Sequence, residues 1–571
     1  MRKRMTVIFS LVFVIGISVS VLAHQVRGRS PQPADHTIHM AQVTSPRPSA
    51  DSQPPLFEKL GNHHHPISTK NALAQRYFDQ GLTLSYGFNH MAAARSFKAA
   101  AQLDPNCAMC YWGIALVLGP NINAPMGEDA LPEAKQALQQ AKVLEQYASE
   151  KERAYIEALA TRYPQQAVGD RKSFDIAYAT AMREIAKRYP DDLDAATLFA
   201  ESLMTTTPWD YWEADGTPKP EGQEIMAVLE SVLKRAPNHP GANHLYIHAV
   251  EKERPDLGVP SADRLMSLVP NSGHLVHMAS HIYIRVGRYH DAVLSNQAGI
   301  AADNLYATQC HAQGIYPLMY MPHNHHFLWF AAQMTGQSKL AIEAAQNTAK
   351  VDAQFLRHPA LAATVQHFST IPMFTDARFG KWDEILALAA PESDLKYPTG
   401  VWHYVRGLAF LAKNQPQQAE QELQQLQLLT TAADLKTMKI GENNPVTSVL
   451  SIAANVLAGE LASYQGNHDQ AITALKQAVK LEDELIYTEP ADWYLPTRQS
   501  LGAILLKAGR ASEAEQVYRE ELKIYPNNGW SLLGLTQSLQ AQNKLQAANA
   551  TQKQFEAAWK YADVKLTASR F

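Results

Sequence analysis

Residues 72–105, ALAQRYFDQGLTLSYGFNHMAAARSFKAAAQLDP, decide the fold of this 571-residue chain. The residues that carry the pattern are small, aromatic or helix-ending, and they are Tyr77, Gly81, Ala93, Phe97, Ala100 and Pro105. Their spacing is that of a helix–turn–helix unit of about 34 residues. Gly81 and Ala93 let the two helices approach closely, Phe97 fills the gap towards the next unit, and Pro105 ends the second helix.

The same spacing recurs further along the chain. The matching residues are Gly502, Ala514, Tyr518 and Pro526; Gly459, Ala471, Leu475 and Ala478; Gly407, Ala419 and Leu423; and Ser280 with Ala292. Strand signals are absent after residue 70, and helical periodicity dominates. The pattern resembles the tetratricopeptide repeat (TPR). That resemblance implies an all-α solenoid, a right-handed superhelix of helical hairpins whose first helices line a concave groove.

The chain divides by composition and repeat quality. We expect a signal peptide (1–23), a disordered tether rich in Pro, Ser, Gln and His (24–69) and N-terminal TPR hairpins (70–118). Degenerate helical repeats with insertions (119–270), histidine-rich TPR-like repeats (271–400) and C-terminal TPR repeats (401–571) follow.

The first residues indicate export. Arg2, Lys3 and Arg4 precede an apolar run over residues 7–22, and Ala23 is a suitable cleavage point. The run is shorter than the roughly 20 residues that span a bilayer, although an uncleaved anchor is the alternative. No later stretch is long and apolar enough to span. We therefore expect a periplasmic or extracellular protein that does not insert into the membrane after cleavage.

The charge balance offers no footprint for nucleic acid. Lys and Arg number 51 against 55 Asp and Glu, for a net charge of -4. Nucleic-acid-binding domains carry a basic patch or stripe, so we expect no nucleic acid as a partner.

Histidines cluster in the middle of the chain. Of the 22 histidines, 11 lie between His239 and His326. Several are three or four residues apart and therefore share one helix face. Imidazoles from two or more helices that converge on one point can bind a transition metal. The candidate ligands are His244, His248, His277, His281 and His326.

Repeat phasing places these candidates in the groove. Ser280 occupies the small-residue position of its hairpin, so His277 and His281 should face the concave surface. If Trp329 takes the equivalent position in the next hairpin, His326 should lie beside His277. The site would hold one transition metal ion such as Zn, Cu or Fe. Isolated histidines more often serve as hydrogen-bonded core residues, and this remains the structural alternative.

Other side chains could line the same groove. The additional ligand candidates are Glu251, His274, His323, Arg285, Trp209 and Trp212. The tryptophans could equally plug irregular hairpins, and Arg285 could equally form a salt bridge. The run at residues 63–65, three consecutive histidines, is interpreted as a solvated loop rather than a metal site. Cys107 and Cys110 are interpreted as a structural pair, either reduced or bridged.

Two functions remain in view. The repeats favour a binding or scaffold module that holds a protein or peptide segment, or a small ligand, in a histidine-lined groove. The matched histidines favour a metal-dependent enzyme, an oxidoreductase or a hydrolase, with its active site in that groove. No nucleophile–base pair or complete catalytic motif is evident in the sequence, which ranks binding first.

Overall fold

The computed structural model describes residues 54–571 except 128, 166–169, 311–315 and 442. The predicted signal peptide, and the predicted tether up to residue 53, lie outside the described residues. The described chain is a succession of helices, and its strands are two residues long. The prediction of an all-α solenoid of helical hairpins is confirmed.

The helices fall into three consecutive groups. The first contains α1 (Ala72–Tyr86), α2 (His90–Leu103), α3 (Ala108–Leu118), α4 (Ala130–Val143), the short η1 (Glu145–Tyr147), α5 (Glu150–Ala160), α6 (Lys172–Arg188), α7 (Leu193–Thr206) and α8 (Pro220–Arg235). The second contains α9 (Pro240–Val250), α10 (Pro255–Leu268), α11 (Gly273–His277), α12 (Ala279–Arg285), α13 (Tyr289–Cys310), the π-turn η2 (Tyr316–Tyr320), α14 (Met321–Met334), α15 (Ser338–Thr348), η3 (Ala353–Arg357), α16 (Ala362–Arg378) and α17 (Trp382–Ala387). The third contains α18 (Lys396–Ala412), α19 (Pro416–Thr430), η4 (Ala433–Leu435), β1 (Lys439–Ile440), β2 (Asn444–Pro445), α20 (Val446–Tyr464), α21 (His468–Asp483), α22 (Thr497–Lys507), α23 (Ala511–Ile524), α24 (Gly529–Ala541) and α25 (Leu545–Ala558).

The hairpins pack as the repeat pattern predicts. The ring of Phe97 on α2 lies where a Cβ atom on Gly81 or on Gly113 would fall, at 2.8 and 2.5 Å respectively. Phe97 therefore joins its own hairpin to the next one, and only glycine leaves room for its ring. Tyr518 repeats this arrangement between Gly502 and Gly534 near the other end of the chain.

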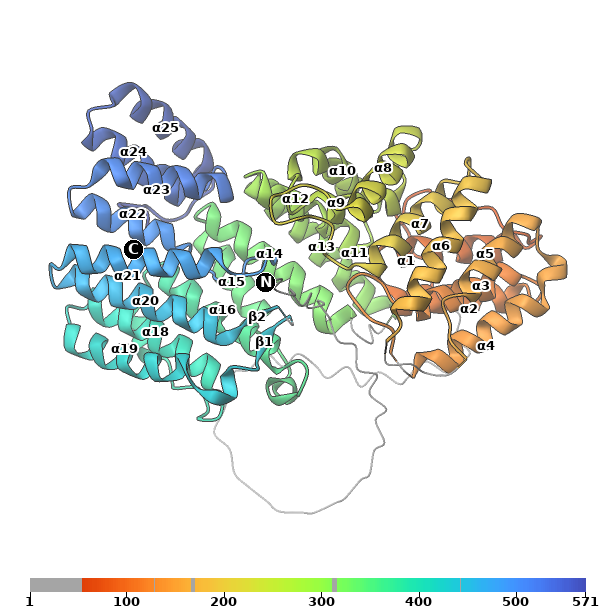
Figure 1. The fold of residues 1–571 in the computed structure, drawn as a ribbon, viewed down its shortest axis with the longest axis horizontal. Coiled ribbons are helices and arrows are strands. Elements are labelled where there is room, and N and C mark those ends of the chain that lie inside the picture. The colour runs from red at the N-terminus through yellow and green to blue at the C-terminus, as the bar shows by residue number, and fades with distance from the viewer. Residues whose placement is uncertain (1–53, 128, 166–169, 311–315, 442) are drawn as a thin grey trace, which may run out of the picture.

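The central hairpins connect the two ends of the molecule. Figure 1 shows α1 to α7 at one end, α18 to α25 at the other, and α9 to α14 between them. Within this centre, α9 contacts α1 and α12, and α11 contacts α14. The first helices of successive hairpins therefore lie side by side, which brings residues far apart in sequence to one place.

The tether ends earlier than the composition predicts. Residues 54–69 lie against the body of the protein, where the Tyr77 hydroxyl donates to the Pro54 carbonyl at 2.8 Å and the Phe57 amide donates to Gln80 Oε1 at 2.7 Å. His65 is buried. Low apolar content predicted disorder here, but specific hydrogen bonds to α1 and α7 order the segment instead.

Two further features correct or resolve the sequence analysis. Contrary to expectation, α20 is long and apolar enough to cross a membrane, with 19 residues and a mean hydropathy of 1.4. However, 72% of this window is buried inside the fold, as expected of a core helix that packs against α18, α19 and α21. Cys107 and Cys110 form a disulfide at the start of α3.

Candidate metal centre

Six histidines meet in the central part of the molecule, and they come from the first helices of three successive hairpins. His244 and His248 are one turn apart on α9, His274 and His277 lie on α11, His281 lies on α12 and His323 on α14. Helical spacing explains the pairs, because residues four apart project from the same face. They form two groups of three.

Triad A comprises His244, His248 and His274. One ligand nitrogen from each lies within 4.8 Å of the others. The ring centroids of His244 and His248 are 4.8 Å apart, and those of His244 and His274 are 5.0 Å apart. All three side chains are buried, with residue exposures of 0%, 4% and 2%.

Triad B comprises His277, His281 and His323, and its nitrogens also lie within 4.8 Å of one another. Nε2 of His277 is 3.0 Å from Nε2 of His281. The His323 ring is 4.9 Å from that of His277 and 5.6 Å from that of His281. His277 and His281 are buried, whereas His323 is partly exposed.

Most of these imidazoles are held through Nδ1. The Nδ1 atom of His244 donates to the Tyr86 carbonyl, that of His277 to Asn296 Oδ1 at 2.7 Å, and that of His248 faces Glu251 Oε1 at 3.3 Å. In His281, Nδ1 lies 2.6 Å from Glu489 Oε2 and 3.1 Å from Glu251 Oε2. In His244, His248 and His277 the facing oxygen atoms place the proton on Nδ1 and leave the lone pair on Nε2, which is the arrangement typical of metal-ligating histidines.

The inward nitrogens of triad A lack partners. Among the described residues, no hydrogen bond reaches Nε2 of His244, Nε2 of His248 or either ring nitrogen of His274. An unpaired buried polar atom costs about 1–3 kcal/mol, so native proteins keep few of them without a reason. A bound metal ion would coordinate one nitrogen from each of the three side chains at once.

Electrostatics keep most of the cluster neutral. Burial, reinforced by neighbouring histidines, holds the pKa values of His244, His274, His277 and His323 well below the ordinary value. Burial also lowers the pKa of His248, although Glu251 opposes it. Neutral imidazole is the form that binds metal.

His281 is the exception. Burial opposes its protonation, but Glu251 and Glu489 outweigh burial and raise its pKa to about 9. Protonated His281 can therefore donate from Nε2 to His277 Nε2 across 3.0 Å. A metal ion bound by triad B must displace this proton. The hydrogen bond satisfies His277 and His281 without metal, but it leaves triad A unexplained.

One phenylalanine covers each triad. Phe88 contacts all three rings of triad A, with centroid distances of 4.6 Å to His244, 6.1 Å to His248 and 5.6 Å to His274. Phe327 lies 4.7, 4.4 and 4.8 Å from the three rings of triad B. Apolar cover of this kind keeps water from the ligands.

Two strained aromatic residues flank triad A. Phe88 has φ +55° and Trp209 has φ +62°, in a region that bulky residues rarely adopt. Both rings contact His248, the Trp209 ring at 4.9 Å. Strain of this kind concentrates at functional sites, where the surrounding structure holds it in place.

The position predicted for His326 is wrong. Its ring lies against Trp329, Phe368 and Tyr494, on the side of α14 that faces α16. His323, which is nearly one turn earlier, meets His277 instead. Repeat phasing placed the groove face of α14 three residues too late, because α14 begins at Met321 after an irregular π-turn.

The other candidates divide between the site and its support. Glu251, His274 and His323 belong to the cluster. Arg285 lies beside it, donating to the carbonyls of Glu251 and Lys252 and lying 3.8 Å from Glu489 Oε1. Trp212 packs in the core, where its indole N–H donates to the Ala249 carbonyl at 2.9 Å.

The sequence alone does not single out four further members of the cluster: Glu489, Asn296, Phe88 and Phe327. Glu489 is 208 residues from His281 and lies in the loop between α21 and α22. The residues next to Glu489 show no spacing typical of metal ligands. Only the folded chain reveals its position.

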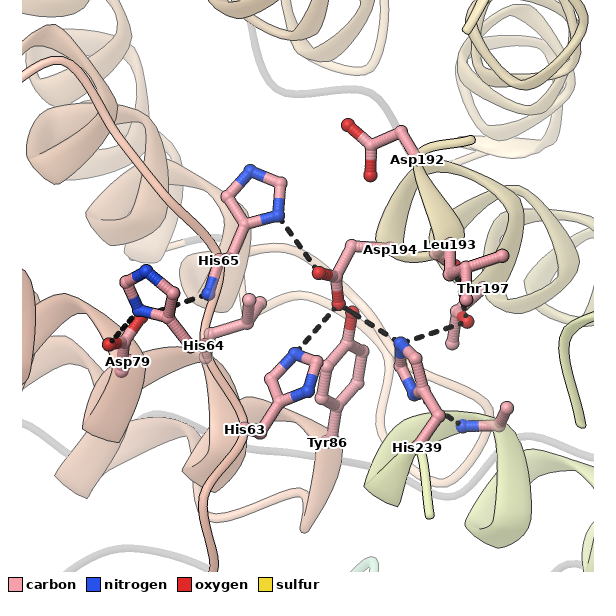
Figure 2. Close-up of polar contacts among 12 residues, drawn as sticks. His63, His64, His65, Asp79, Tyr86, Asp192, Leu193, Asp194, Thr197 and His239 are labelled. Atoms are coloured by element: carbon pink, nitrogen blue, oxygen red, sulfur yellow. Dashed lines mark hydrogen bonds and ion pairs between the residues drawn. The ribbon is translucent and has the colours of Figure 1, made fainter. Parts of the chain in front are cut away.

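The histidine run at residues 63–65 is not a solvated loop (Figure 2). His63 Nε2, His65 Nδ1 and His239 Nε2 contact the Asp194 carboxylate at 2.9, 2.8 and 3.1 Å, and the Tyr86 hydroxyl also donates to it. The prediction of a solvated loop rested only on the polarity of the neighbouring residues. The partner that buries this run, Asp194, lies more than a hundred residues away.

The side chains around Asp194 form a hydrogen-bond network. His239 caps α9 by accepting the Ala242 amide at Nδ1, so Nε2 carries the proton that is donated to Asp194. Burial opposes ionisation, but His63, His239 and His65 hold the pKa of Asp194 well below its ordinary value. The network fixes Tyr86 and the start of α9, and both of these position His244.

Comparison with known proteins finds a repeat family over part of the chain. Residues 450–527 match the family model of the tetratricopeptide repeat, and this segment is similar to such repeats. The matched segment includes all of α21, α22 and α23, far from the histidine triads in sequence. No curated protein matched the sequence at a significant level.

Several solved structures resemble the chain along most of its length. The human IFIT1 dimer with m7Gppp-AAAA is 13% identical, covers 87% of this chain and 91% of its own, and has a TM-score of 0.30. The APC/C hetero-tetramer Cut9–Hcn1 is 13% identical, with coverages of 82% and 76% and a TM-score of 0.30. Yeast Tom70 is 12% identical, with coverages of 84% and 89% and a TM-score of 0.24. These similarities are too low to transfer a ligand or a partner.

Proposed function

We propose that this protein is an exported TPR solenoid that binds transition metal through the histidines of triads A and B. The observation that carries the proposal is the arrangement of triad A. Three fully buried imidazoles converge, two are held through Nδ1, and every nitrogen that faces inward lacks a partner among the described residues. Imidazole ligands suit Zn, Cu, Fe and Ni.

Export is part of the proposal. The N-terminal sequence has the features of a cleavable signal, and the Cys107–Cys110 disulfide is typical of an oxidising compartment. Cleavage after Ala23 predicts that the mature chain begins at His24. N-terminal sequencing of the protein recovered from its native compartment tests this; a retained Met1 would contradict it.

The repeats also support a scaffold role, in which a protein or peptide segment occupies the groove. One observation favours the enzyme alternative. A cavity of about 190 Å³ lies against Glu489 and is lined by Arg285 and Tyr487. It borders the carboxylate that contacts triad B, so a small molecule bound there would lie next to the centre.

Elemental analysis tests metal binding. The mature protein, residues 24–571, is purified without a histidine tag and analysed by inductively coupled plasma mass spectrometry. We expect near-stoichiometric transition metal, with a clear loss in a His277→Ala/His281→Ala variant. His403→Ala is the matched control, because His403 also pairs with a glutamate, Glu422, but belongs to neither triad. Absence of metal after reconstitution would leave only the scaffold role.

A further inference from the structure

The two triads repeat one design. Each consists of two histidines four residues apart and a third histidine from the next hairpin. The pair lies on α9 in triad A and spans α11 and α12 in triad B, and the third histidine lies on α11 and α14 respectively. His244 and His248 are completed by His274, and His277 and His281 are completed by His323. Each set also has its own phenylalanine, Phe88 or Phe327, in contact with all three rings. The repeat of the solenoid therefore generates two equivalent sites.

The triads are in direct contact. The rings of His248 and His281 are 5.7 Å apart, and those of His274 and His277 are 5.8 Å apart. These separations across the triads fall within the range found inside them, since His248 and His274 are 6.5 Å apart. Two ions held in this way would be neighbours, as in two-metal sites whose ions lie about 3.5–4 Å apart.

The types of ligand limit which metal ion the site would bind. All six proposed ligands are imidazole nitrogens, while the two carboxylates, Glu251 and Glu489, contact the outer nitrogen of His281. Non-haem iron sites use a carboxylate as a direct ligand beside two histidines. Among the metals that suit imidazole, copper binds nitrogen sites most tightly. Three ligands per ion leave a coordination position open for a further molecule.

We propose that triads A and B form a dinuclear copper centre that binds dioxygen between the two ions. This inference rests on the proposed function and specifies its stoichiometry, its metal and its small-molecule ligand. Two Cu(I) ions each give one electron to dioxygen, which becomes a bridging peroxide as both ions become Cu(II). No proton is needed for this step, and the charge balances. His323 is partly exposed, so dioxygen would reach the centre from the side of triad B.

Copper reconstitution tests the proposal on the mature full-length protein. Cu(II) is added in the presence of equimolar Zn(II), bound metal is counted by mass spectrometry, and unpaired spins are counted by electron paramagnetic resonance. We expect two copper ions per chain and almost no spin signal, because a hydroxide from solvent that bridges two neighbouring Cu(II) ions would couple their spins. After anaerobic reduction with ascorbate, dioxygen should produce a near-ultraviolet absorption band that the reduced protein lacks.

Variants that remove one triad provide the matched comparison. His244→Ala/His248→Ala should retain one copper with the full signal of one spin and should lose the dioxygen band. His277→Ala/His281→Ala should behave in the same way. His244→Gln/His248→Gln keeps side-chain volume if the alanine variant fails to fold, and His403→Ala should match the parent protein.

The outcomes separate the two proposals. One copper per chain, two copper ions with two independent spins, or preferential binding of zinc would overturn the dinuclear copper centre while leaving metal binding intact. Two spin-coupled copper ions without a dioxygen absorption band would overturn the proposal that dioxygen binds between them. Failure to bind any metal would overturn both this inference and the proposed function.

Discussion

At the scale of single residues, the least expected feature is a buried histidine whose ring forms no hydrogen bond among the described residues. His274 is 2% exposed, and neither ring nitrogen has a partner among the described residues. His239, by contrast, forms hydrogen bonds through both ring nitrogens. The two unpartnered ring nitrogens of His274, together with its place beside His244 and His248, are the reason for proposing it as a ligand.

Replacing His274 should affect the metal-free and metal-bound proteins in opposite directions. His274→Leu removes two unsatisfied atoms, so we expect the free energy of unfolding of the metal-free protein to rise by about 1–2 kcal/mol. Metal binding should weaken. Urea unfolding with and without chelator measures both effects. His239→Leu is the control and should destabilise either form, and destabilisation of the metal-free protein by His274→Leu would indicate a purely structural histidine.

The Asp194 cluster should make stability depend on pH. The pKa of Asp194 is well below its ordinary value in the folded state, so the carboxylate stabilises the fold above the unfolded pKa of 3.8. This contribution is lost as the pH falls through the folded pKa. Burial opposes protonation of His65, but Asp194 raises its pKa overall, so its contribution is lost as the pH rises through that raised value. Stability from this cluster is therefore greatest in mildly acidic solution.

Removing the Asp194 charge tests this linkage. Asp194→Asn should lower the free energy of unfolding by about 3–5 kcal/mol near pH 6, because it breaks a buried ion pair. The variant should also lose most of the dependence of stability on acid. Chemical denaturation between pH 3 and 8 measures both effects. Asp191→Asn, a neighbouring exposed carboxyl, is the control, and an unchanged acid profile in Asp194→Asn would contradict the linkage.

Residue types and spacing predicted most members of the site but not their pairing. His244, His248, His277 and His281 could be found because spacings of four place them on one face. His326 was chosen over His323 because the phase of α14 depends on an irregular turn that the repeat pattern does not encode. Glu489 and Asp194 carry no local signal, since their partners are distant in sequence.

At the scale of elements, the aromatic residue between successive hairpins holds the solenoid together. Phe97 is fully buried between Gly81 and Gly113. Phe97→Ala should lower the free energy of unfolding by about 3–5 kcal/mol, because a large cavity would open at the joint. Met91→Ala on the same helix is the control, since Met91 is 44% exposed and should change little. Equal effects of the two variants in thermal unfolding would contradict this packing.

Glu489 should strengthen metal binding without being a ligand itself, because it contacts the ligand His281. Glu489→Gln removes the charge that contacts His281 Nδ1, and changes of this kind weaken metal binding by about 10–100-fold. Competition with a chelator of known affinity measures the loss. Glu484→Gln, an exposed residue near the end of the same helix–loop segment, should leave affinity unchanged. An equal affinity in both variants would remove Glu489 from the site.

Helix type and hairpin order followed from the sequence because small and aromatic residues recur with the repeat. The order of residues 54–69 did not, because it depends on partners such as Gln80 and Asp194 rather than on apolar content. The burial of α20 could not be read from its hydropathy, which a core helix and a membrane helix share.

At the scale of the whole molecule, the proposed metal centre lies between the two ends of the solenoid (Figure 1). Its ligands come from α9, α11, α12 and α14, and its supporting carboxylate comes from the loop before α22. Binding should therefore stabilise the centre more than the ends. Hydrogen exchange should slow in α9 to α14 and in residues 487–489 after metal is added, while α24 and α25 stay unchanged. Uniform slowing, or none, would contradict this coupling.

The central claim is that metal ions occupy the histidine triads, and anomalous diffraction tests it most directly. Crystals of the copper-loaded protein would be measured on both sides of the copper absorption edge. We predict two anomalous peaks, one within about 2.0–2.1 Å of the Nε2 atoms of each triad, by analogy with other metal–imidazole bonds. Peaks elsewhere, such as at the Asp194 cluster, or no peak at either triad, would contradict the account.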